Sequence, residues 1–221
     1  MRALLAAVTI LLALYAADAK GPDTETTTVE GELPAELPGR WLVVEQSRLR
    51  TGLVQPFARL WEIRRGPNGV ELVIARVRLP ETVSRQLTAA GHANRGWLPD
   101  DETLRRTAET WDELPESDTD VQQATYRIVG DASGGKTFTI TTEERFSGTR
   151  PVTLTRGAYN VREWSPQRFV GTFARLAEVG PPGPTSITLN DLFQASRLPD
   201  VPPRARLRRV VDALLGRDEP P

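Results

Sequence analysis

The sequence contains no cysteine and only one histidine, His92, among its 221 residues. The absence of cysteine excludes a disulfide framework, a thiolate nucleophile and a cysteine-based zinc site, and a single histidine excludes a multi-histidine metal site. The formal net charge is -1. Without an excess of positive charge, the chain is not expected to bind nucleic acid through a basic surface. We therefore predict no metal site, no cofactor and no nucleic-acid partner.

Residues 1–19 have the pattern of a secretory signal peptide. Arg2 supplies a positive charge, residues 3–17 carry no charge, and Ala17-Asp18-Ala19 has the small residues that signal peptidase requires. The apolar run is shorter than the roughly 20 residues of a membrane-spanning helix. We expect cleavage after Ala19 to release a secreted or periplasmic bacterial protein with no transmembrane span. A retained N-terminal anchor is the alternative interpretation.

The chain after the predicted cleavage site divides into three parts. Residues 20–36 are acidic and almost free of bulky apolar side chains, which predicts a flexible tether. Residues 37–180 contain most of the alternating apolar patterns and form the predicted β-barrel domain. Residues 181–221 begin with a Pro-rich linker and continue as a helical C-terminal extension.

Alternation of apolar and polar residues predicts the strands of the domain. Phe57, Trp61 and Ile63 share one face of a strand, and a turn at 66–69 leads into a second strand, so that 57–79 forms a hairpin. Further strands are expected in a hairpin at 121–141 and at 152–154, 159–164 and 168–179, the last broken by Gly171. The expected fold class is mainly β with helical additions: an antiparallel β-barrel or strongly curved sheet of six to eight strands.

Residues 80–114 change to helical periodicity and predict a helical insertion. Pro80 can begin one helix, and Asp100 or Asp101 can cap a second. Two more helices are expected near the C-terminus, at 188–197 and after Pro202-Pro203. The last of these carries arginines and an apolar stripe, so it can contact a membrane surface or a protein, or pack on the domain.

Two polar features each have a functional and a structural interpretation. The acidic loop at 112–120 offers the oxygen ligands that calcium prefers, but it lacks the glycine and the regular spacing of a calcium loop, which favours a solvated loop. His92 is the only histidine available to a catalytic triad. It lies at a helix exit with no nucleophile motif nearby, which favours a histidine stabilised by the helix dipole. We therefore expect no catalytic residue. A hydrolase that uses His92 is the third functional hypothesis, after the ligand-binding protein and the interaction module that are described below.

Gly39-Arg40-Trp41 resembles the Gly-x-Trp motif that opens the lipocalin and lipocalin-like barrels. In that family the tryptophan closes one end of an eight-stranded barrel and stacks on an arginine from the last strand. The resemblance implies a structural pair between Trp41 and Arg175, because Arg175 lies on the apolar face of the last predicted long strand. The helical block at 80–114 and the loose match of Thr119-Asp120 to the family's second motif depart from the pattern. The resemblance implies that a small apolar ligand binds in the barrel mouth.

These observations favour an exported, non-catalytic protein that binds a small hydrophobic or lipid-like ligand in a β-barrel. The residues expected to line the site are aromatic, although each can equally fill the core: Trp41, Trp61, Tyr126, Phe138 and Phe173. The alternative is an envelope or extracellular protein-interaction or structural module. In that case the acidic loop or the basic C-terminal helix would be the contact surface.

Overall fold

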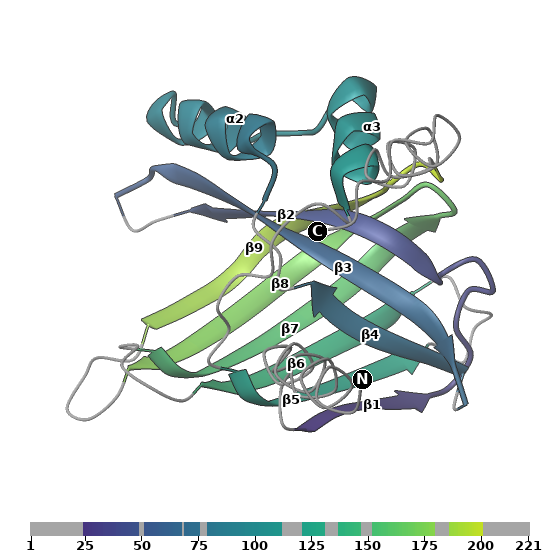
Figure 1. The fold of residues 1–221 in the computed structure, drawn as a ribbon. Coiled ribbons are helices and arrows are strands. Elements are labelled where there is room, and N and C mark those ends of the chain that lie inside the picture. Colours follow the sequence, from purple (N-terminus) through teal and green to yellow (C-terminus); the bar gives the residue numbers. More distant parts are fainter. Residues whose placement is uncertain are drawn as a thin grey trace, which may run out of the picture.

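A computed structural model of the chain describes residues 24–48, 51–67, 69–75, 79–111, 121–130, 137–146, 152–179 and 186–200. They form a nine-stranded mixed sheet that curls into a nearly closed barrel with two helices outside it (Figure 1). Around the barrel the order is β1-β5-β6-β7-β8-β9-β2-β3-β4. The strands are β1 (Thr24–Glu30), β2 (Gly39–Arg48), β3 (Val54–Gly66), β4 (Gly69–Ala75), β5 (Val121–Gly130), β6 (Phe138–Phe146), β7 (Val152–Ser165), β8 (Arg168–Val179) and β9 (Ser186–Arg197).

Both predicted hairpins are confirmed, as β3 with β4 and as β5 with β6. The two short strands expected at 152–154 and 159–164 are instead one strand, β7. Gly157 lies between them and continues the ladder, where it pairs with Arg175 on β8. Gly171 does not break β8. A Cβ atom at Gly171 would lie 1.9 Å from the carbonyl oxygen of Asn160, so the glycine is required by the close packing of β7 and β8.

Two predictions at the ends of the barrel are wrong. Residues 24–30, expected to be part of a flexible tether, form β1 and pair in parallel with β5. Only Val29 of β1 packs against the core, so the strand lacks the apolar alternation that predicts one. Residues 188–197, expected to be a helix, belong to β9, in which buried Phe193 and Ala195 alternate with more exposed neighbours. The barrel therefore extends past the predicted limit at residue 180.

Side chains, rather than a backbone ladder, hold β1 beside β4. The backbone N–H of Leu72 donates to Thr27 Oγ1 at 3.3 Å, and that hydroxyl lies 3.5 Å from the Leu72 carbonyl oxygen. No strand pairing joins β1 to β4 in the part of the chain that the structure describes. On its other edge, β1 is tied to β5 by two hydrogen bonds from Arg127 to Glu30, at 2.7 and 3.1 Å. The barrel thus has a seam between β1 and β4.

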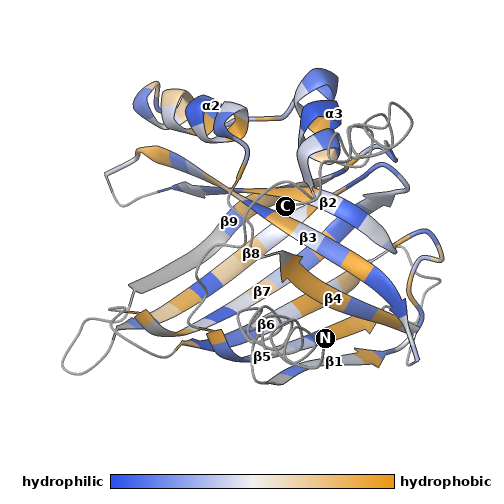
Figure 2. Cartoon of the chain, in the orientation of Figure 1, coloured by the Kyte–Doolittle hydropathy of each residue, from blue (hydrophilic) through white to orange (hydrophobic). Residues whose placement is uncertain are grey.

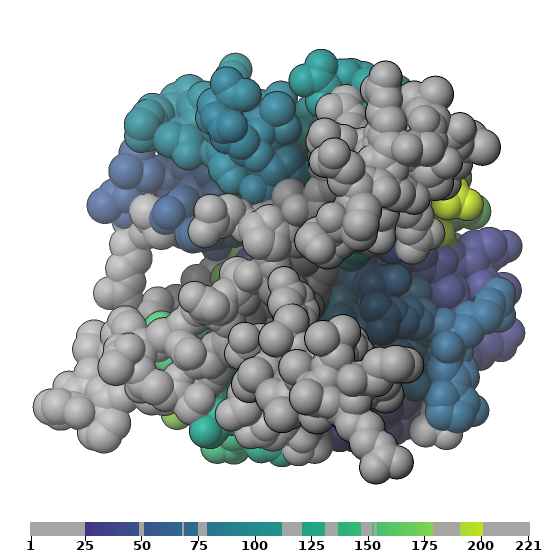
Figure 3. All heavy atoms as spheres, viewed as in Figure 1, coloured from purple at the N-terminus to yellow at the C-terminus, as the bar shows by residue number. Residues whose placement is uncertain are grey.

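The predicted helical insertion is confirmed as α2 (Glu81–His92) and α3 (Asp101–Thr110). The side chain of Asp100 caps α3 by accepting a hydrogen bond from the Thr103 N–H at 2.7 Å. Both helices lie along one side of the molecule, outside the barrel (Figures 1 and 3). Apolar contacts of α3 and the adjoining Trp111 with the outer faces of β2 and β3 form a second, smaller core of Leu42, Leu60, Ala108, Trp111 and Leu198.

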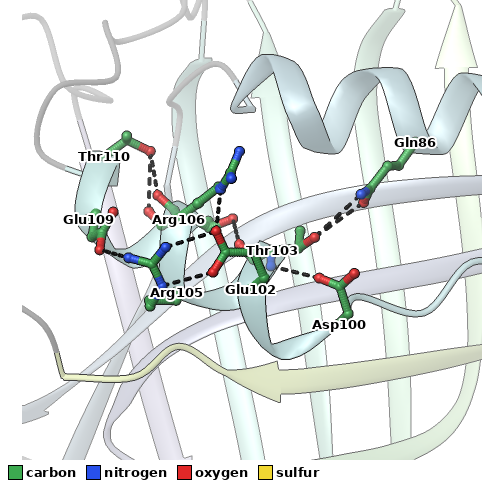
Figure 4. A network of polar contacts seen from close by, with 9 residues as sticks. Gln86, Asp100, Glu102, Thr103, Arg105, Arg106, Glu109 and Thr110 are labelled. Atoms are coloured by element: carbon green, nitrogen blue, oxygen red, sulfur yellow. Dashed lines mark hydrogen bonds and ion pairs between the residues drawn. The ribbon is translucent and has the colours of Figure 1, made fainter.

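The outward face of α3 is polar and carries a local network of charges (Figures 2 and 4). Glu102 accepts hydrogen bonds from Arg105 and Arg106, and Arg105 also pairs with Glu109. Gln86 of α2 lies 3.4 Å from the Thr103 hydroxyl and links the two helices. No helix of the described segments is long and apolar enough to cross a membrane.

Three sequence predictions fall outside the described residues. They are the signal peptide at 1–19, the acidic loop at 112–120 and the last helix, which begins after Pro202-Pro203.

Candidate functional site

Aromatic side chains fill one half of the barrel interior. Trp41, near the start of β2, and Trp164, near the end of β7, lie at that end of the barrel, which we call the Trp41 end. The ring centroids of Trp41 and Phe169 are 4.7 Å apart, and those of Trp61 and Tyr159 are 4.8 Å apart. All five aromatic residues predicted to line a ligand site are buried in the same core cluster: Trp41, Trp61, Tyr126, Phe138 and Phe173. The structure therefore brings these residues together, and it packs them in a common core.

Arg197 of β9, rather than Arg175, lies over the Trp41 ring. The guanidinium carbon of Arg197 is 4.4 Å from the ring centroid. The same guanidinium donates to the carbonyl oxygens of Glu36, Pro38 and Pro166, which fixes it across the Trp41 end. The predicted Trp41–Arg175 pair is thus replaced by Trp41–Arg197. The reason is that the last strand of the barrel is β9, in a segment predicted from its sequence to be helical.

Toward the opposite end of the barrel, the interior becomes polar. Six side chains from six strands form what we call the polar cluster: Glu45, Arg59, Tyr126, Glu144, Tyr159 and Arg175. Strand alternation places their side chains on the inner face, beside residues of the main core.

Glu45 is the centre of the polar cluster. Its Oε1 accepts a hydrogen bond from the Tyr159 hydroxyl at 2.7 Å and lies 3.2 Å from Arg59 Nε. Its Oε2 pairs with the Arg175 guanidinium. Glu144 forms the second half of the cluster. Its Oε1 accepts from the Tyr126 hydroxyl at 3.3 Å, and its Oε2 is 4.0 Å from Arg59 Nη1.

The cations of the polar cluster are more accessible than its anions. The side chains of Arg59 and Arg175 are 27% and 19% exposed, whereas those of Glu45 and Glu144 are 0% and 8% exposed. A molecule that reaches the cluster therefore meets guanidinium groups before it meets carboxylates. The accessible surface of the site is electropositive, although two arginines and two glutamates balance in formal charge.

Burial and neighbouring charges fix the protonation states of the cluster. Burial raises the pKa of Tyr159, and the charge of Glu45 raises it further, so its hydroxyl remains a hydrogen-bond donor at neutral pH. Burial opposes the charge on Arg59. The negative charges of the surrounding Glu45 and Glu144 favour the cation, and the pKa of Arg59 lies above its ordinary value. Arg59 is therefore a permanent cation inside the barrel.

Trp61 is a buried hydrogen-bond donor beside this cluster. Its indole Nε1 finds no acceptor among the described residues, and the side chain is fully buried. Trp61 follows Arg59 by two positions on β3, so the two side chains share the inner face. Two positions before Arg59 on the same face is Phe57, which is 38% exposed. We call this end of the barrel the Phe57 end. From the Phe57 end inward, β3 thus presents an apolar ring, a cation and an unpartnered N–H group.

His92 lies away from the polar cluster. It is exposed at the end of α2, outside the barrel, where it borders a hollow of about 420 Å³ shared with Leu53, Pro56 and Leu87. Within the described segments, no three histidine, aspartate or glutamate side chains gather as a metal-binding group.

Part of the polar cluster, but not its centre, could be predicted from the sequence. Arg175 was expected on an apolar face as the partner of Trp41, because a charge on such a face needs a partner, and the structure pairs it with Glu45. Glu45 follows the apolar run Leu42 to Val44, and the same rule applied to it would have marked it as an inward charge. Adjacent Glu143 and Glu144 point to opposite faces of β6, since Glu144 is buried and Glu143 pairs with Arg156 outside.

Comparisons with protein-family models, with curated proteins and with solved structures gave no significant match. The candidate site is therefore defined by its geometry alone.

Proposed function

We propose that this protein is an exported, non-catalytic binding protein that takes a small hydrophobic or lipid-like ligand into the Phe57 end of a lipocalin-like barrel. The observation that carries the proposal is the polar cluster. Burying charged groups is costly, and a barrel that served only as a scaffold would be at least as stable with an apolar core of the same shape. A partly accessible cluster inside a barrel is the kind of convergent polar group that orients a ligand in an otherwise apolar site.

Two further observations support a lipocalin-like relationship. Gly39-Arg40-Trp41 opens β2, and the Trp41 ring carries an arginine from the last strand of the barrel, which is the pairing that the resemblance implies. Arg197 and the segment that precedes β2 cover the Trp41 end. A ligand would then enter from the opposite end, where Phe57 is exposed. Export of the protein is proposed from the signal-peptide pattern of residues 1–19.

The proposal predicts that a neutral apolar fluorophore binds at the Phe57 end. We would titrate the full chain with N-phenylnaphthylamine, whose emission rises in an apolar site, and measure saturation and displacement by lipid extracts. Phe57→Asp should weaken binding at least tenfold. The matched control is Leu192→Asp, because Leu192 is a 63% exposed apolar residue on the outer side of β9. Absence of saturable binding, or equal loss in the two variants, would refute a site at the Phe57 end.

A further inference from the structure

The inner face of β3 has hydrogen-bond donors in excess of acceptors. Arg59 contacts Glu45 through Nε, at 3.2 Å, while its Nη1 stays 4.0 Å from Glu144 and so beyond a hydrogen bond. Trp61 Nε1 has no acceptor among the described residues. A guanidinium carries five N–H groups and an indole one, and neither can accept a hydrogen bond. The arrangement therefore lacks acceptor oxygens, and it lacks them next to a fixed positive charge.

From this donor excess we infer that the ligand carries a carboxylate, which the guanidinium of Arg59 and the indole N–H of Trp61 bind inside the barrel. The inference rests on the proposed binding function and names the chemical class of its ligand. A buried N–H group without an acceptor is destabilising, and an oxygen from a ligand would remove that cost. An anionic oxygen would stabilise these donors more than a neutral oxygen, because a hydrogen bond to an ionised acceptor is about twice as strong as one between neutral groups.

Three features favour a carboxylate over a larger anion. The free donors on the inner face of β3 are those of one guanidinium edge and one indole, which match the two oxygens of a planar carboxylate better than the three oxygens of a phosphate. The cluster is neutral in formal charge, so a single negative charge disturbs it less than a double one. Tyr159 and Arg175 are already engaged by Glu45 and stabilise the Glu45 carboxylate that holds Arg59 in place.

The position of Phe57 defines the direction of binding. Phe57, Arg59 and Trp61 follow at every second position, so their side chains line the inner face in a row from the mouth inward. Phe57 is exposed and apolar, whereas Trp61 is buried. An amphipathic acid would place its carboxylate deep, against Arg59 and Trp61, and its apolar part outward, against Phe57.

The test uses three probes with one alkyl chain. Decanoate, decanol and decyl phosphate are titrated into the full chain by calorimetry at neutral pH. We expect decanoate to bind at least tenfold more tightly than decanol and more tightly than decyl phosphate. Equal affinity for decanoate and decanol would be compatible with the proposed binding function but would overturn the inference that the ligand carries a carboxylate. Tighter binding of decyl phosphate would overturn the same inference and favour a phosphate ligand. No binding by any of the three would refute the inference, and N-phenylnaphthylamine would then show whether the proposed function fails with it.

Variants assign the effect to the two residues. Trp61→Phe removes the indole N–H and keeps an aromatic ring, so it should weaken decanoate binding about tenfold and leave decanol unchanged. Trp164→Phe is the matched control, because Trp164 packs against the same core at the Trp41 end. Arg59→Lys keeps the charge and loses the planar fork, and it should also reduce the preference for decanoate over decanol. Retained preference in both Trp61→Phe and Arg59→Lys would contradict the assignment.

Discussion

Glu45 and Tyr159 are 114 positions apart in the sequence, and the hydroxyl of Tyr159 donates a 2.7 Å hydrogen bond to Glu45 Oε1. The same carboxylate faces Arg59 and Arg175, so groups from three other strands depend on one fully buried anion. The polar cluster is therefore a coupled unit, in which removal of one charge leaves the others without compensation.

Glu45→Gln should destabilise the protein strongly. The variant leaves two guanidinium groups in the barrel without their shared carboxylate, and loss of one partner of a buried ion pair typically costs about 3–5 kcal/mol. The measurement is the free energy of unfolding in urea. Glu62→Gln is the control, because Glu62 pairs at 2.8 Å with the well-exposed Arg64 and such pairs contribute about 0–1 kcal/mol. Similar losses in the two variants would show that the cluster is not coupled.

Gly171→Ala should destabilise the barrel, whereas Gly91→Ala should not. An added Cβ at Gly171 would clash with the Asn160 carbonyl oxygen and lie 2.9 Å from Phe193, and such overpacking costs about 1–3 kcal/mol. At Gly91, within α2, the nearest atom would be Pro56 Cδ at 3.8 Å, and alanine is favoured over glycine in a helix by about 0.5–1 kcal/mol. Thermal unfolding should therefore shift in opposite directions. A stable Gly171→Ala variant would mean that β7 and β8 are less closely packed than described.

Arg197→Lys should weaken the closed end of the barrel although the charge is kept. Arg197 donates to the three carbonyl oxygens from three different nitrogens, Nε, Nη1 and Nη2. A lysine has a single nitrogen, which cannot occupy those three positions, and it cannot stack as a plane on Trp41, so a loss of about 1–3 kcal/mol is expected. The near-ultraviolet circular dichroism signal of the tryptophans should change as well. Arg162→Lys, at an exposed position of β7, serves as the comparison. If Arg197→Lys behaved like Arg162→Lys, the stacking and the carbonyl contacts would contribute nothing measurable.

The attachment of β1 should depend on pH through Glu30. The hydrogen bond from Arg127 lowers the pKa of Glu30 from its ordinary value of 4.5. Because the pKa is lower in the folded chain than in the unfolded chain, the contribution of the pair is complete above about pH 4.5 and is lost as the pH falls through the lowered value. Hydrogen exchange of peptides covering 24–30 should therefore be faster in Glu30→Gln than in the original protein at pH 7.

At a pH below the lowered pKa of Glu30, the exchange rates of those β1 peptides in the two proteins should converge, because Glu30 is then uncharged in the original protein and the glutamine of the variant carries no charge at any pH. Peptides from β8 should exchange equally in the two proteins at either pH. A difference in β1 that persists at low pH would show that Glu30 holds β1 by something other than its charge.

Local patterns predicted those parts of the barrel whose strands have one apolar face. The hairpins β3–β4 and β5–β6 and the bounds of β8 follow from alternation, and the helical insertion follows from its change of period. The sequence did not predict β1 and β9, and the reason differs between the two strands. β1 is nearly all polar and gains its place by pairing with a strand far along the chain. In β9, Thr188 and Asn190 resemble helix caps, and the tertiary ladders with β8 and β2 override that local preference.

The candidate site was less accessible to sequence reasoning than the fold. The five aromatic residues expected to line a ligand site all lie in the main core, and their part in ligand binding stays a prediction. The pairing of charged residues inside the barrel depends on how the barrel closes. Arg175 was matched with Trp41 because β8 was taken as the last strand, and the addition of β9 gives that position to Arg197. Glu45 and Arg59 lie on paired strands, but Glu144 joins them only across the barrel.

The parallel pairing of β1 with β5 has a consequence for the order in which the protein can be completed during synthesis. Glu30 and Arg127 are 97 positions apart, so at about 5–20 residues per second β1 is made roughly 5–20 s before its partner. An apolar strand left alone for that time would be prone to aggregate. β1 consists of threonines, glutamates and one valine. The low apolar content that made β1 resemble a tether limits its aggregation until β5 has been made.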